Sequence, residues 1–189
     1  MAQILVFGHS ITAGQWDTEG GWVQRLRTFL DSRALRRQDE NLINYVYNLG
    51  IGGDTSRDLL ERIEQEIEPR FEPENLNIVM IQIGENDIQR VDGEVRIDEE
   101  MFRTNLEQMI DIAEDYADEI LVVGAFSANP ELETVPHSGG KQVSEDRRRR
   151  YEEIKQEVAE SRDTGFINLY HLRDQEVHES TEDGIHPTD

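Results

Sequence analysis

The chain has 189 residues, with 41 acidic and 19 basic side chains and a formal net charge of −22 at pH 7. This length suits one domain with a substantial core, and so acidic a surface argues against nucleic-acid and anionic-membrane partners. The sequence contains no cysteine, which excludes disulfides, thiolate catalysis and cysteine-ligated metals. No apolar stretch is long enough to span a membrane and no secretory signal is evident, so we expect a cytoplasmic protein.

Five apolar runs rich in β-branched residues predict strands that are buried on both faces. They are, in chain order, Ile4–Phe7, Leu42–Tyr47, Ile78–Ile83, Ile120–Val123 and Phe166–Leu169. Apolar residues at helical spacing lie between them, within Trp22–Leu30, Leu59–Ile67, Phe102–Ala113 and Tyr151–Val158. Strands that alternate with helices predict an α/β fold with a five-stranded, doubly wound parallel sheet, whose ligands bind at the carboxyl ends of the strands.

Polar residues follow three of these strands. Ser10 comes after the first run, a glycine-rich stretch that includes Gly53 follows the second, and Asn86 follows the third. Taken singly, the serine is more commonly a helix cap, and the glycines and the asparagine are common turn residues. Together at one edge of a sheet, they can supply a nucleophile and hydrogen-bond donors for a developing oxyanion.

Two further candidates lie in a turn after the last strand. Asp183 and His186 are three residues apart, so the carboxylate can reach one imidazole nitrogen and fix the tautomer. The other nitrogen is then available to take the proton of Ser10. The sequence therefore predicts Ser10 as nucleophile, His186 as general base and Asp183 as the group that orients the base.

Two segments with unusual composition lie before and within the fourth helix. Residues 127–144 carry prolines and glycines and are expected to form a long loop on the active side of the sheet. Residues 147–150 are four consecutive arginines. On a helix these point in different directions, so we expect a solvated face with acidic partners such as Glu152 and Glu153, and a phosphate-binding patch is the alternative.

Four segments resemble, in order, the motif blocks of the SGNH, or GDSL, hydrolase family. They are Gly-His-Ser-Ile at 8–11, Asn-Leu-Gly-Ile-Gly-Gly-Asp-Thr-Ser at 48–56, Gly-Glu-Asn-Asp at 84–87 and Asp-Gly-Ile-His-Pro at 183–187. The resemblance covers nearly the whole chain. It implies a single three-layer αβα domain over residues 1–189, hydrolysis of esters or thioesters through an acyl-enzyme, and an oxyanion hole of Ser10, Gly53 and Asn86. It also implies that no metal or organic cofactor is needed.

The chain departs from the family pattern in two places. His9 stands where the family has an aspartate before the serine, so the turn that holds Ser10 is either looser or bonded by the imidazole instead. The sequence stops at Asp189, where the family continues into a helix that covers the sheet. We therefore expect the sheet face near the first two strands to be less covered than the opposite face.

Two other functions fit parts of the sequence. The segment from Ser10 to Gly14 loosely resembles a phosphate-cradling loop, as in a flavodoxin-like nucleotide or flavin binder. A catalytically inactive relative that serves as an interaction module is the other alternative. For the enzyme, we expect a small soluble ester as substrate, with Trp16, Phe126, Leu132 and Val135 among the apolar walls of the cleft. The sequence leaves the oligomeric state open.

Lysine is scarce in this acidic sequence. Only Lys141 and Lys155 are present, whereas arginine is common. A folded protein with this charge repels itself unless salt screens the charges. The pattern resembles that of proteins from halophiles that accumulate salt, and an ordinary acidic protein is the alternative.

Overall fold

The structure, a computed structural model, describes residues 1–39, 42–125, 144–170 and 186. Its main sheet consists of the five parallel strands β1 (Ala2–Gly8), β2 (Asn44–Gly50), β3 (Leu76–Gln82), β6 (Glu119–Val123) and β7 (Gly165–Ile167). The helices are α1 (Ser10–Ala13), α2 (Gly21–Arg37), α3 (Ser56–Ile67), α4 (Glu99–Glu114) and α5 (Glu145–Ser161), with a 3-10 turn η2 (Glu68–Arg70) after α3. The strand order β2-β1-β3-β6-β7 confirms the predicted doubly wound parallel sheet.

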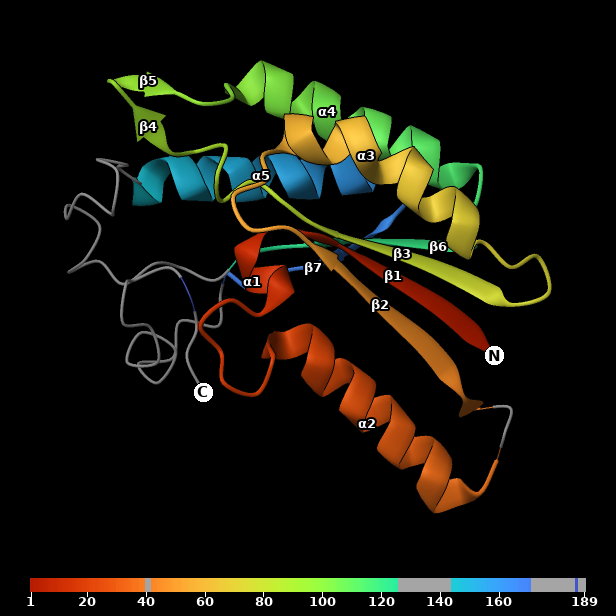
Figure 1. Cartoon of the computed structure of the whole chain (residues 1–189). Coiled ribbons are helices and arrows are strands. Elements are labelled where there is room, and N and C mark those ends of the chain that lie inside the picture. Colours follow the sequence, from red (N-terminus) through yellow and green to blue (C-terminus); the bar gives the residue numbers. More distant parts are fainter. Residues whose placement is uncertain (40–41, 126–143, 171–185, 187–189) are drawn as a thin grey trace.

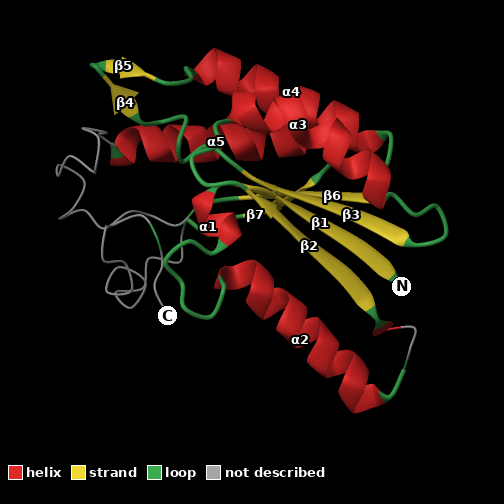
Figure 2. Ribbon diagram, viewed as in Figure 1, coloured by secondary structure: helices red, strands yellow, loops and turns green. Residues whose placement is uncertain are grey.

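The helices form layers on the two faces of this sheet. Figures 1 and 2 show α3, α4 and α5 on one face and α2 on the other. The larger apolar core lies under the three helices, where side chains such as Phe7, Ile81 and Phe102 have no exposed surface. The smaller core lies between α2 and the other face, around Val6 and Val23. A three-layer αβα arrangement results.

The two strands nearest the amino terminus differ in burial. All seven residues of β1 are buried because it pairs with β2 on one side and β3 on the other. The expectation of burial on both faces is wrong for β2, in which Leu49 alone is buried, because β2 is an edge strand. This strand also lies later in the sequence than its apolar run predicts, since in-register pairing with β1 opposes Asn44 to Ala2 and Gly50 to Gly8.

Helix α2 covers its face of the sheet unevenly. Ile4 and Val6 are buried against α2, so this helix covers β1 on that face. Further along the sheet, Ile78 and Leu121 are only partly buried. Val46 of β2 is likewise only partly buried, so among the described residues α2 covers β1 best. The thinner cover expected over the first two strands stays a prediction for β2.

A small hairpin follows the third strand and was not predicted. Its strands β4 (Arg90–Val91) and β5 (Glu94–Val95) are antiparallel and are joined by Asp92 and Gly93. Both turn residues have positive φ, 54° and 87°, as a two-residue hairpin turn of the Asp-Gly type requires. The sequence signal was the Asp-Gly pair itself, although the flanking strands are too short to show an alternating pattern.

Local sequence explains where the main helices begin. Thr55 caps α3, and its side chain and that of Asp58 bond each other's backbone N–H in a capping box. The Asp98 carboxylate accepts a hydrogen bond from the Met101 N–H and caps α4. Within the described part of the chain, no helix combines the length and apolar character that crossing a membrane requires.

We predict that salt stabilises this fold. With a net charge of −22, the acidic side chains repel one another, and at molar salt the screening length falls to about 3 Å. The midpoint of thermal unfolding should therefore rise between low and molar potassium chloride. Thermal melts monitored by circular dichroism measure it, and a midpoint that is flat or falls with added salt would contradict adaptation to high salt.

Candidate active site

The centre of the site is a contact between two residues that lie 176 positions apart in the sequence. The Ser10 Oγ is 2.7 Å from the His186 Nε2, which is within hydrogen-bond distance. Ser10 is the first residue of α1, directly beyond the carboxyl end of β1, and it is largely buried. A hydroxyl in this position can pass its proton to the imidazole, so the pair has the geometry of a nucleophile and its base.

His9 caps the short helix that carries Ser10. Its Nδ1 accepts a hydrogen bond from the Ile11 N–H at 3.3 Å, which is the bond that an aspartate would make there. Burial lowers the pKa of His9 from 6.5 to about 4, against the opposing effect of Glu85. The imidazole is therefore neutral near pH 7 and can act as an acceptor. The family aspartate is replaced by a residue that makes the equivalent bond.

Neighbouring strands fix α1 from two sides. The Asn48 Nδ2 donates to the Thr12 carbonyl at 2.8 Å, and the Thr12 hydroxyl donates to the Gln82 Oε1 at 2.7 Å. At Gly50, a Cβ would lie 2.5 Å from the Ala13 nitrogen, so only glycine lets α1 approach β2 this closely. These contacts determine the direction in which Ser10 faces. The motifs contained the glycine but gave no indication of the role of Gln82.

The glycine-rich loop between β2 and α3 passes beside Ser10. A Cβ on Gly52 would lie 4.0 Å from the Ser10 Cβ, so the two backbones are close. Gly53 has φ +91°, and a Cβ there would meet no atom within 4 Å. The backbone conformation, not a lack of space, therefore selects glycine at this position. Its exposure leaves room for a ligand next to the loop.

Asn86 lies on the other side of this loop with its side chain held in one orientation. The Asn86 Nδ2 donates to the Asp54 carbonyl at 2.9 Å, and its Oδ1 accepts from the Gln89 Nε2 at 2.9 Å. An amide NH₂ carries two hydrogens, so the second can bind an oxyanion. Gln89, which fixes this orientation, was not predicted, and its spacing of three residues from Asn86 is the only signal in the sequence.

Asp87 ties the asparagine loop to the start of α3. Both of its carboxylate oxygens lie 3.0 Å from the Ser56 N–H, and the residue is fully buried. Burial raises the pKa of Asp87 to about 6. This contact and the bond from Asn86 to Asp54 hold the two loops at one spacing, so the predicted donors on Gly53 and Asn86 keep a fixed relation to each other.

Arg62 links the same loop to the sheet. Its guanidinium donates to the Leu49 carbonyl at 2.9 Å and forms an ion pair with Asp54 at 2.9 Å. The same side chain pairs with Glu66 one turn along α3. A substitution of Arg62 would therefore disturb the loop by removing its link to β2.

The arginine run on α5 corrects one sequence prediction. Arg150 is solvated and pairs with Glu99 and Glu153, as expected. Arg148 is buried and makes a two-pronged ion pair with Glu85, with a shortest distance of 2.8 Å. The prediction of a wholly solvated face is therefore wrong at Arg148, because its side of α5 faces the sheet rather than water.

A second buried ion pair lies one turn further along α5. Glu152 binds Lys155 and also accepts a hydrogen bond from the Ala125 N–H at 3.0 Å, just after β6. Burial would raise the pKa of Glu85, but Arg148, Lys155 and His9 outweigh it and lower that pKa. Glu85 is next to Asn86, so the two pairs join α5 to strand ends that border the site. Glu152 is therefore buried, and the prediction that it lies on a solvated face is wrong.

The remaining predicted residues divide into two groups. Trp16 lies against His186, with ring centroids 5.2 Å apart and ring planes inclined at 41°. Asp183, Phe126, Leu132 and Val135 lie outside the described residues, as does the loop predicted at 127–144 except for Ser144. Among the residues that the structure does describe, no group of three or more histidine, aspartate or glutamate side chains is arranged to hold a metal ion.

A serine hydroxyl bonded to an imidazole at the carboxyl edge of a doubly wound sheet has the geometry of a nucleophile and its base, which carboxylic ester hydrolases share with other serine hydrolases. Comparison with known proteins agrees with this class. The model of the GDSL-like lipase/acylhydrolase family matches residues 6–189, and the chain belongs to that family. It is therefore a carboxylic ester hydrolase whose substrates are small-molecule esters, and the predicted resemblance to this family is confirmed. Family membership also removes the flavin-binding alternative.

Solved structures show the same fold. The lipase/acylhydrolase from Enterococcus faecalis is 26% identical with a TM-score of 0.72, over 100% of this chain and 88% of that chain. An acetyl xylan esterase from Geobacillus stearothermophilus is 19% identical with a TM-score of 0.71, over 98% of this chain and 86% of that chain. The hydrolase LAE5 from the Lake Arreo metagenome is 17% identical with a TM-score of 0.71, over 98% and 87% of the two chains. No curated protein matches the sequence.

We predict that His9 makes stability depend on pH. The unfolded chain binds a proton at this side chain below pH 6.5, whereas the folded chain does so only below about pH 4. The stability due to neutral His9 is fully present above pH 6.5 and is lost as the pH falls towards 4, by about 3 kcal/mol in total. Asp87 acts in the opposite direction, because its raised pKa favours the folded state at low pH.

The variant His9→Asn separates the two effects, since asparagine can cap a helix but does not titrate. Urea unfolding of both proteins between pH 7 and pH 4 measures the difference in their free energies of unfolding. As the pH falls, the free energy of unfolding of the wild type should decrease relative to that of the variant. A difference that stays constant over this range would show that His9 does not titrate as its burial requires.

Proposed function

We propose that this esterase acts through an acyl-enzyme on Ser10, with His186 as general base and Asp183 orienting the imidazole. The observation that carries the proposal is the distance of 2.7 Å between the Ser10 Oγ and the His186 Nε2. In the first step the Ser10 proton moves to that nitrogen while the Oγ attacks the ester carbonyl carbon. This requires the other ring nitrogen, Nδ1, to carry the second hydrogen, and a carboxylate such as Asp183 would hold it.

The oxyanion of the tetrahedral intermediate is proposed to bind three donors. The Ser10 N–H is at the start of α1, where helix N–H groups have no partner within the helix. The other two are the Gly53 N–H and the second hydrogen of the Asn86 amide. Support comes from the rigid link between these loops, because donors that are already oriented need no rearrangement when charge develops.

Collapse of the intermediate releases the alcohol. The imidazolium of His186 returns its proton to the alcohol oxygen, which leaves the acyl group on the Ser10 Oγ. Water then enters, His186 takes its proton, and the same oxyanion donors stabilise the second intermediate. The carboxylic acid leaves and Ser10 regains its proton, so each cycle consumes one water and needs no other co-reactant.

Variants of the Geobacillus esterase give independent support. Those described as catalytic mutants replace a serine, a histidine and an aspartate, the last two being three residues apart in that protein. Asp183 and His186 have the same spacing here. At about 19% identity the two chains share the fold, and the matching residue types make Asp183 the candidate for the third member.

Labelling with a fluorophosphonate tests the nucleophile directly. Because the reagent reacts only with an activated serine, mass spectrometry of the digested protein should find one adduct, on the peptide that contains Ser10. Ser10→Ala should lose both the adduct and nearly all ester hydrolysis, whereas the control Ser161→Ala should keep both. An unlabelled wild-type enzyme without esterase activity would favour the inactive relative that acts as an interaction module.

The oxyanion assignment is tested with Asn86→Ala. Losing one such donor typically lowers kcat by about 10²–10³, with a smaller effect on KM because the charge exists only in the transition state. Steady-state kinetics on a soluble acetate ester measure both constants, and Asn75→Ala, far from the site, is the matched control. A rise in KM with unchanged kcat would make Asn86 a residue for binding the substrate instead.

A further inference from the structure

A bulky residue holds a strained backbone conformation beside the catalytic pair. Trp16 has φ +71°, in the left-handed region that large side chains rarely adopt. The neighbouring positions with such angles in this loop, Gly14, Gly20 and Gly21, are all glycine. A residue kept at unfavourable backbone angles next to a reactive group indicates that its side chain has a use there.

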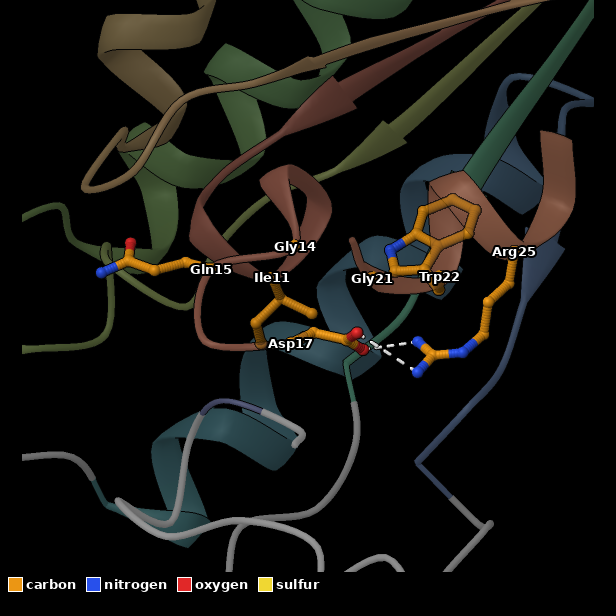
Figure 3. Close-up of a pocket in the computed structure, with 7 residues that line it drawn as sticks. All are labelled: Ile11, Gly14, Gln15, Asp17, Gly21, Trp22 and Arg25. Atoms are coloured by element: carbon orange, nitrogen blue, oxygen red, sulfur yellow. Dashed lines mark hydrogen bonds and ion pairs between the residues drawn. The ribbon is translucent and has the colours of Figure 1, made fainter. Parts of the chain in front are cut away.

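The loop that carries Trp16 is firmly closed. Asp17 pairs with Arg25 of α2, as Figure 3 shows. The Asp17 carboxylate also accepts a hydrogen bond from the Glu19 N–H. The backbones of Gly14 and Gly21 are in direct contact, since a Cβ on Gly21 would lie 2.5 Å from the Gly14 Cα. The closing residues, among them Asp17, Gly21 and Arg25, line a cavity of about 160 Å³, and Trp16 is not among its lining residues.

The indole therefore has a fixed position and an open face. It contacts the His186 ring at a centroid distance of 5.2 Å, and the residue is 56% exposed. Covering an exposed indole removes apolar surface from water, which is favourable. A flat ring packs best against the face of the indole.

The chemistry of ester cleavage says which part of the substrate reaches this face. His186 must return its proton to the alcohol oxygen, so that oxygen has to come within about 3 Å of the imidazole nitrogen. The acyl carbonyl faces the donors on Gly53 and Asn86 instead. The atoms attached to the alcohol oxygen are therefore the ones that lie near Trp16.

We propose that Trp16 is a platform that binds the alcohol part of the substrate through the flat face of a ring, aromatic or sugar. This specificity role rests on the proposed roles of Ser10 and His186. Esters of ring alcohols would gain a contact that esters of short acyclic alcohols cannot make. The contact between Trp16 and His186 thus favours ring alcohols as the leaving group of the substrate.

The test compares phenyl acetate and an acetylated methyl xyloside with ethyl acetate, in the wild type, Trp16→Ala and Trp16→Phe. We expect Trp16→Ala to lower kcat/KM for at least one ring ester by about tenfold, mainly through KM. Ethyl acetate should change by no more than about twofold, as for an ordinary surface substitution. Trp16→Phe should restore most of the loss, and Phe29→Ala on α2, which is 57% exposed, is the matched control.

Each outcome decides the question. A loss confined to phenyl acetate identifies an aromatic alcohol, and one confined to the xyloside identifies a sugar. An equal loss of kcat/KM on all three esters would overturn the platform and make Trp16 a support for His186 alone. Unchanged kcat/KM values for all three esters would overturn it as well. Ser10→Ala with ethyl acetate tests the proposed catalytic roles separately, because that ester does not depend on Trp16.

Discussion

The register of β1 with its two neighbours is the constraint on which the site depends. Gly8, the last residue of β1, is opposite Gly50 of β2 and Gln82 of β3, so three strands end at one level. Whatever follows each strand must leave the sheet at the same edge. Ser10 and the loops that carry Gly53 and Asn86 are brought together for this reason, although long helical segments separate them in the sequence. A shift of one residue in either pairing would move the loops apart and turn side chains to the opposite face.

Polar side chains then fix what the register brings together. Arg62 joins the end of β2 to the glycine loop, and Asp87 joins the asparagine loop to the start of α3. In the interior, Arg148 of α5 pairs with Glu85, which is next to Asn86. Such groups are costly to bury, and removing one partner leaves an unpaired charge, so each pair demands one arrangement of its elements. The loops around Ser10 are therefore held by specific bonds and not by apolar packing alone.

His9 shows that a motif position is defined by its bond and not by its residue type. An imidazole kept neutral by burial accepts the N–H that caps α1, as a carboxylate would. Glu85 raises the pKa of His9, whereas Lys155 and Arg148 lower it, so the protonation of the residue that caps α1 depends on the ion pairs of α5. This interior contains one of only two lysines in a sequence of net charge −22. Two of the basic residues, Arg148 and Lys155, are thus buried in ion pairs.

The sequence by itself determined the class of fold, the family and the candidates Ser10, Gly53, Asn86 and His186, because apolar runs and motif blocks are local patterns. Only the tertiary structure decided the partners. It brought His186 to Ser10 and Trp16 to His186, and it buried Arg148 while Arg150 stayed in water. Four consecutive arginines look alike in a sequence, since nothing local states which side of the helix will face the sheet. Burial and pairing depend on how separate elements pack, and that information is spread over the whole chain.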